Sequence, residues 1–137
     1  MNINTSIKIL LVSISAIILF HIAVIATIIP YNIAWGGRLK NDTEMYIFEV
    51  ISIFINLLLV FVLLMKGDYI KFKFQNKTIN ILLWGFLILF VLNTVGNFFA
   101  KTDFEKLFAI LTFFFATLIW TILRVKHNDT TQKVVMK

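Results

Sequence analysis

The sequence has no cysteine among its 137 residues, a single proline, and only 15% charged residues. A chain without a thiol cannot form a disulfide, a thiolate metal site or a cysteine nucleophile, so disulfide-exchange enzymes are excluded. The familiar catalytic and phosphate-binding motifs are missing too, because the chain contains no HExxH, no GxSxG and no glycine-rich phosphate loop. We therefore predict no bound metal, no cofactor and no enzymatic activity.

Hydrophobic residues make up 60% of the chain, whereas soluble domains average roughly 45–50%. They cluster in four stretches, residues 7–29, 46–65, 79–99 and 104–123. Each stretch approaches or exceeds the ~20 residues that a helix needs to cross a ~30 Å hydrocarbon core. We predict an all-α fold, a bundle of four transmembrane helices in up-down-up-down order that forms a single membrane domain over residues 1–137.

The connections between these stretches are short. The first stretch is too long for the apolar part of a signal peptide and lacks a good cleavage site, so we predict an uncleaved span that ends at Pro30. A loop over residues 30–45 and a basic loop over residues 66–78 follow, and a polar tail covers residues 124–137. Only residues 100–103 separate the third stretch from the fourth, which predicts two antiparallel neighbours.

Lysine and arginine residues predict the orientation, because cytoplasmic loops carry an excess of them. With the amino terminus inside, nine are cytoplasmic and four are external; the nine are Lys8, Lys66, Lys71, Lys73, Lys77, Arg124, Lys126, Lys133 and Lys137. Both termini are therefore predicted to be cytoplasmic. The abundance of Ile, Phe, Asn and Lys is typical of an AT-rich prokaryotic gene, so we expect a bacterial inner or plasma membrane.

The net charge of +6 lies in short segments beside the spans, where basic side chains meet anionic headgroups at about 1 kcal/mol each. Lys71 and Lys73 alternate with Phe72 and Phe74, a pattern that suits the headgroup level of a membrane. The expected partner is thus the lipid bilayer, with a homodimer as a further candidate. A nucleic-acid partner is not expected.

Polar residues inside the spans are the candidate site, because a bilayer makes them costly. Glu49 and Asn56 are seven residues apart and share a helix stripe, and Asn93 and Asn97 are four apart on another helix. On the predicted topology these residues converge with His21 in the outer half of the membrane. The predicted ligand-binding residues, with two from the loop above the pocket, are Glu49, His21, Asn93, Asn97, Asn56, Arg38 and Trp35.

Each of these residues also has a structural interpretation. The three asparagines could join neighbouring helices by hydrogen bonds, and His21 could be a packed partner. Glu49 could reach water or pair with Arg38. Trp35 could anchor the chain at the membrane interface. Gly96, beside the asparagines, is expected to let another helix approach closely.

Three segments carry a resemblance. They are Trp35-Gly36-Gly37-Arg38-Leu39, Asn93-Thr94-Val95-Gly96-Asn97, and Thr102 with Glu105-Lys106. With them the chain resembles uncharacterised bacterial four-span membrane proteins of similar length, over nearly its whole length. This resemblance implies no activity. The chain departs from small multidrug exporters, which carry their essential glutamate inside the first span, where this sequence has His21.

Three functions are compatible with the pattern. The first hypothesis is a non-enzymatic protein that binds a small molecule, a lipid or a partner helix through a polar pocket in the outer half of the bundle. The second is an oligomeric transporter or proton-coupled carrier in which Glu49 titrates. The third is a membrane enzyme that acts on a lipid through His21 and Glu49.

Overall fold

The structure is a computed structural model that describes residues 2–35 and 38–125. Its elements are α1 (Ile3–Ile25), a short α2 (Tyr31–Trp35), α3 (Asp42–Lys66), α4 (Asn76–Phe98) and α5 (Asp103–Arg124). No strand occurs in this part of the chain. The four long helices are each long and apolar enough to cross a membrane. The predicted helical class and the number of long helices are confirmed.

The first helix begins and ends earlier than the predicted apolar stretch, residues 7–29. α1 stops at Ile25, and Thr27 adopts a φ of 59°, in the left-handed region that β-branched residues seldom occupy. The amides of Ile28 and Ile29 both donate to the carbonyl oxygen of Ala23, at 3.0 and 3.2 Å, which closes the turn. The chain therefore reverses before Pro30, and residues 31–35, predicted as loop, form α2.

The other long helices begin in polar residues outside the apolar stretches. The side chain of Asn41 accepts a hydrogen bond from the amide of Glu44 at 2.9 Å, so α3 starts at Asp42. Such a cap satisfies an amide that has no partner within the helix. Caps of this kind extend a helix beyond the boundary that hydropathy predicts.

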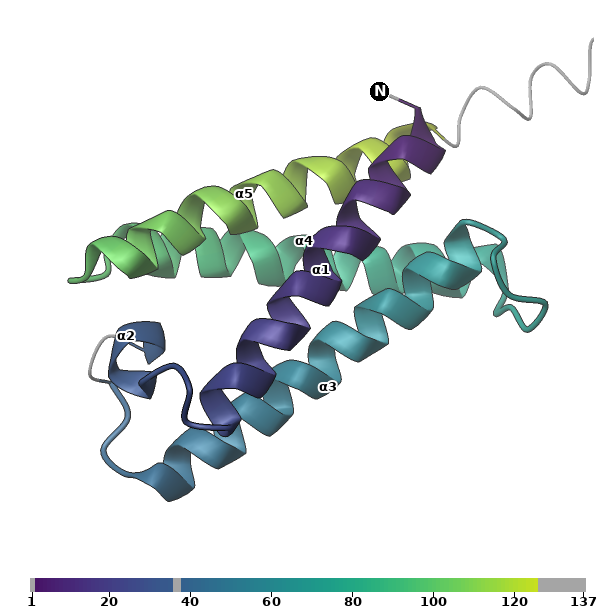
Figure 1. Cartoon of the computed structure of the whole chain (residues 1–137). Coiled ribbons are helices and arrows are strands. Elements are labelled where there is room, and N and C mark those ends of the chain that lie inside the picture. Colours follow the sequence, from purple (N-terminus) through teal and green to yellow (C-terminus); the bar gives the residue numbers. More distant parts are fainter. Residues whose placement is uncertain (1, 36–37, 126–137) are drawn as a thin grey trace, which may run out of the picture.

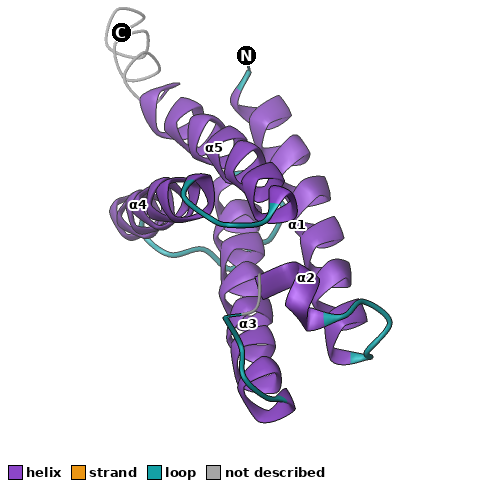
Figure 2. Cartoon of the chain, turned by 90° about the vertical axis from the view of Figure 1, so that its left-hand side faces the viewer, coloured by secondary structure: helices purple, strands orange, loops and turns teal. Residues whose placement is uncertain are grey.

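The long helices form two pairs. α1 lies beside α3, and α4 lies beside α5 (Figure 1). The two pairs cross at a steep angle. In Figure 2, α4 is viewed almost end-on, whereas α3 is viewed from the side. The amino terminus, the α3–α4 connection and the end of α5 lie on one side of the molecule, and α2 lies on the other (Figure 1).

The apolar core lies on the side opposite α2. It comes from the first halves of α1 and α4 and the second halves of α3 and α5. Its buried members include Ile7, Leu10, Ile14, Leu59, Val62, Leu63, Ile79, Leu83, Phe86, Phe115, Ile119 and Ile122. Close packing therefore joins the pairs at one end, and they diverge toward the other (Figure 1).

One expectation is wrong, and another concerns residues that the structure does not describe. Gly96 does not mediate close helix contact, because a Cβ placed there would meet no heavy atom of the described residues within 4 Å. The predicted polar tail lies mostly outside the described residues, as do Lys126, Lys133 and Lys137.

Candidate functional site

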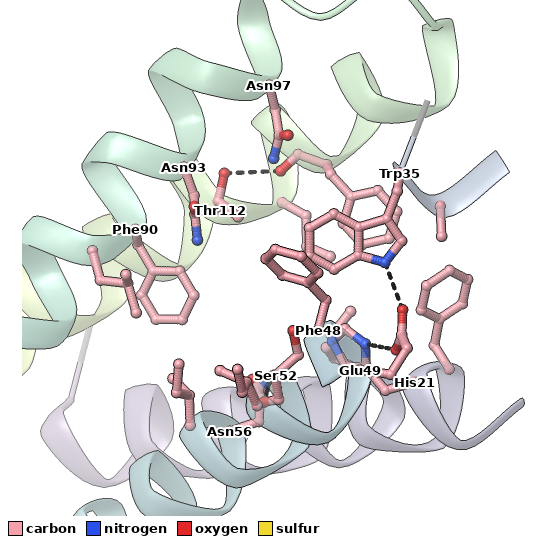
Figure 3. Close-up of a pocket in the computed structure, with 18 of the residues that line it drawn as sticks. His21, Trp35, Phe48, Glu49, Ser52, Asn56, Phe90, Asn93, Asn97 and Thr112 are labelled. Atoms are coloured by element: carbon pink, nitrogen blue, oxygen red, sulfur yellow. Dashed lines mark hydrogen bonds and ion pairs between the residues drawn. The ribbon is translucent and has the colours of Figure 1, made fainter. Parts of the chain in front are cut away.

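A pocket of about 380 Å³ lies where the two helix pairs diverge, with walls from α1, α3, α4 and α5 and a cover from Ala34, Trp35 and Arg38 (Figure 3). All seven residues that the sequence singled out line it: Glu49, His21, Asn93, Asn97, Asn56, Arg38 and Trp35. The expected convergence of these residues is therefore present in the structure. Their role in ligand binding stays a prediction.

Glu49 organises the wall formed by α1 and α3. Its side chain is 0% exposed, and each carboxylate oxygen has its own partner. Oε2 lies 2.6 Å from Nδ1 of His21 on α1, and Oε1 accepts a hydrogen bond of 2.6 Å from Nε1 of Trp35 on α2 (Figure 3). Glu49 thus neither reaches water nor pairs with Arg38, and Trp35 has a role inside the pocket.

A second buried carboxylate lies on the opposite wall. Oε1 of Glu105, on α5, is 3.1 Å from Nη2 of Arg38, and its side chain is 6% exposed. Oε2 accepts a hydrogen bond of 2.9 Å from Oγ1 of Thr102, which in turn caps α5 by accepting from the Glu105 amide. The arginine therefore pairs with a glutamate outside the predicted site.

Glu105 is not among the predicted site residues, although it is the second residue of the fourth apolar stretch. Two signals could have found it. Thr102 and Glu105 have the Thr-x-x-Glu spacing of a capping box, which places Glu105 in the first turn of a helix. Phe108 and Thr112 then follow at i+3 and i+7, on the same stripe, and both line the pocket.

The side chains of Trp35 and Arg38 contact different helix pairs. Trp35 donates to Glu49 on α3, whereas Arg38 contacts Glu105 on α5. The two residues are three apart in sequence, and they hold carboxylates that belong to different pairs. These two residues therefore link the helix pairs at the divergent end of the molecule, beside the pocket.

The amide side chains of Asn93 and Asn97 point from α4 into the pocket (Figure 3). Neither makes a hydrogen bond within residues 2–35 and 38–125, and Asn56 donates to the carbonyl of Ser52 in its own helix at 2.8 Å. The helix-joining role considered for the asparagines thus has no support in this part of the chain. The polar contact between α4 and α5 comes instead from other residues, Thr94 and Thr112, whose hydroxyls are 2.9 Å apart.

Aromatic side chains form the deeper walls. Phe20 of α1 packs against Phe108 of α5 with ring centroids 5.6 Å apart, and Phe90 packs edge-on against Phe115 at 5.4 Å. All four line the pocket, which is polar near α2 and apolar toward the core. The site can therefore hold a molecule that has one polar and one apolar part.

The pocket offers little for catalysis. Among the described residues, no group of three His, Asp or Glu side chains could hold a metal ion. His21 and Glu49 form one acid–base pair, and no serine or threonine hydroxyl in the described chain is hydrogen-bonded to the histidine. The arrangement supports binding or proton exchange better than covalent chemistry.

Replacing Arg38 by alanine is expected to loosen α2, because Glu105 would keep Thr102 as its partner while the ion pair between Arg38 and α5 is lost. Amide hydrogen exchange in residues 31–35 should become faster in the Arg38→Ala protein. Lys40→Ala is the matched control, since Lys40 contributes only its backbone amide to a hydrogen bond. Equal exchange in both variants would contradict the linking role of Arg38.

No family model matches the chain, and comparisons with the curated proteins and with the solved structures give no match. A functional proposal for the chain therefore rests on the geometry of the pocket.

Proposed function

We propose that this chain is a multi-pass membrane protein whose four long helices cross the bilayer in up-down-up-down order. The apolar composition of the four helices supports insertion. Nine basic residues against four support cytoplasmic termini, which puts α2 and the pocket in the outer half of the membrane. A bacterial inner or plasma membrane stays the proposed location.

The cytoplasmic face is proposed to contact anionic headgroups through the basic loop. Phe72 and Phe74 pack against Phe61 of α3 with ring centroids 6.3 and 6.4 Å away, so the loop is joined to the apolar surface. Lys71 and Lys73, which flank Phe72 in the sequence, can extend to the headgroups. A second copy of the chain remains a candidate partner.

The proposed function is the non-enzymatic binding of a small molecule or lipid in the pocket. One observation carries it. A single pocket of about 380 Å³ is lined by all seven predicted residues, which come from α1, α2, α3, α4 and, in the case of Arg38, the connection after α2. Polar groups in a membrane are costly unless they are used or paired. Asn93 and Asn97 have no partner in the described chain, which favours a ligand.

Native mass spectrometry of protein released from native nanodiscs tests this function. We expect the wild-type protein to retain a small molecule, which Asn93→Phe should displace by filling the pocket. Leu92→Phe is the matched control, because Leu92 is the neighbouring residue on α4 and is 64% exposed on its outer face. A wild-type protein without a bound molecule, or one that keeps it in Asn93→Phe, would refute the proposal.

A proton-coupled carrier is the second candidate. The observation in its favour is the contact between Glu49 and His21, two groups that exchange protons, on the pocket wall. A carrier would move the retained molecule into proteoliposomes in response to a pH gradient, and Glu49→Gln would abolish the dependence on the gradient. A protein that binds its molecule without moving it would exclude the carrier and leave the binding function.

A further inference from the structure

We infer that the pocket selects an uncharged amphiphile with one apolar chain, whose polar end carries hydroxyl groups. The inference rests on the proposed binding function and specifies the chemistry of the ligand. It follows from which polar groups of the pocket are already paired and which are free.

The charged groups are already paired. All four carboxylate oxygens of Glu49 and Glu105 have a partner, namely His21, Trp35, Arg38 and Thr102. A cationic ligand would have to compete with these partners for a carboxylate. An anionic ligand would meet two carboxylates, while the arginine of the pocket is held by one of them. Both kinds of charge are therefore disfavoured.

The free polar groups are neutral. Asn93 and Asn97 make no hydrogen bond to the described residues, and their amides lie on the pocket wall (Figure 3). Each carboxamide offers an NH₂ donor and a carbonyl acceptor. Hydroxyl groups both donate and accept, so a polar end with two hydroxyls can pair with both amides. The two asparagines are one helical turn apart, which suits adjacent hydroxyls.

The apolar chain follows from the walls below the amides. Phe90 and Phe86 lie about one and two turns below Asn93 on α4, and Phe115 faces Phe90 from α5. Pocket residues on α5 extend from Glu105 to Phe115, a rise of about 15 Å. The volume of about 380 Å³ is near the lower end for ligand pockets, which favours one chain over two.

Tryptophan fluorescence provides the test, because the chain has three tryptophans and only Trp35 lines this pocket. Trp84 of α4 and Trp120 of α5 pack against each other with ring centroids 5.6 Å apart, and both are partly exposed. A Trp84→Phe/Trp120→Phe protein in nanodiscs therefore reports occupancy through quenching of Trp35 by brominated probes. A Trp35→Phe protein, with the other two tryptophans, measures partition into the bilayer.

Five brominated probes with the same acyl or alkyl chain separate the alternatives. They are a monoacylglycerol, the methyl ester of the same fatty acid (which has no hydroxyl group), the free fatty acid, the alkylamine and a diacylglycerol. The monoacylglycerol should quench Trp35 saturably, at a concentration about tenfold below that of the ester, since two hydrogen bonds distinguish them. The Asn93→Ala/Asn97→Ala variant should lose that advantage. Leu92→Ala/Val95→Ala, on the outer face of α4, should keep it.

Each of the other outcomes would refute a different part of this inference. Tighter saturable binding of the fatty acid or the alkylamine would refute the uncharged ligand and leave the pocket as a binding site. Equal binding of ester and monoacylglycerol would refute recognition by the asparagines. Tighter binding of the diacylglycerol would refute the single chain and indicate a bilayer lipid. Without saturable quenching by any probe, the binding function itself would be wrong.

Discussion

Replacement of Glu49 by alanine should lower the free energy of unfolding by about 2–4 kcal/mol, because two donors lose their acceptor at once. Nδ1 of His21 and Nε1 of Trp35 both lie 2.6 Å from this carboxylate. The His21 side chain is only 15% exposed, so water replaces the lost partner poorly. Insertion should not suffer, since the substitution removes a carboxylate from an apolar helix.

Unfolding in SDS, followed by circular dichroism, measures this loss, and insertion is scored separately by membrane fractionation. Glu44→Ala is the matched control, because Glu44 lies on the same helix and accepts only the Lys40 amide at 2.9 Å. Glu49→Gln should keep most of the stability, since the amide can still accept from Trp35. If both alanine variants lose the same free energy of unfolding, the contacts of Glu49 with His21 and Trp35 do not stabilise the fold.

Replacement of Phe115 by alanine should cost about 3–5 kcal/mol, the usual loss for a large buried aromatic. Phe115 is 2% exposed, lies in the core where the helix pairs meet, and packs against Phe90. In a bilayer this cost comes from lost packing between helices, because lipid offers no hydrophobic driving force for their association.

Phe113→Ala provides the comparison on the same helix, since Phe113 is 60% exposed. Its effect should stay within about 0.5 kcal/mol. The same SDS unfolding assay measures both variants. Equal losses would mean that the pairs are not joined through the core around Phe115. In that case the pocket above it would have no rigid base.

Helical periodicity explains why much of the site was predictable. Glu49 and Asn56 share a face of any helix that contains them, and so do Asn93 and Asn97. Four helices that alternate in direction would then bring these faces to one end of the bundle. No contact had to be known for this part of the prediction.

The partners of the charged residues could not be predicted in the same way. Arg38 is one of the predicted site residues, yet it contacts Glu105, which is 67 residues further along the chain. Glu49 takes His21 and Trp35 instead. These choices depend on the path of the chain around α2, where Thr27 at a positive φ ends α1 before Pro30. Hydropathy carries no information about such a turn.

The sequence by itself determined that the chain forms four long apolar helices. It also determined which polar residues share a helix face, because helix length and side-chain spacing are local properties. Only the tertiary structure decided that the helices pair as α1 with α3 and α4 with α5, that the pairs diverge at the α2 end, and that a pocket lies between them. The physical reason is that apolar side chains pack by shape. Phe115 packs against Phe90 at the boundary between the apolar core and the pocket. Hydropathy cannot predict this contact, because the same two residues would have the same hydropathy if they faced lipid.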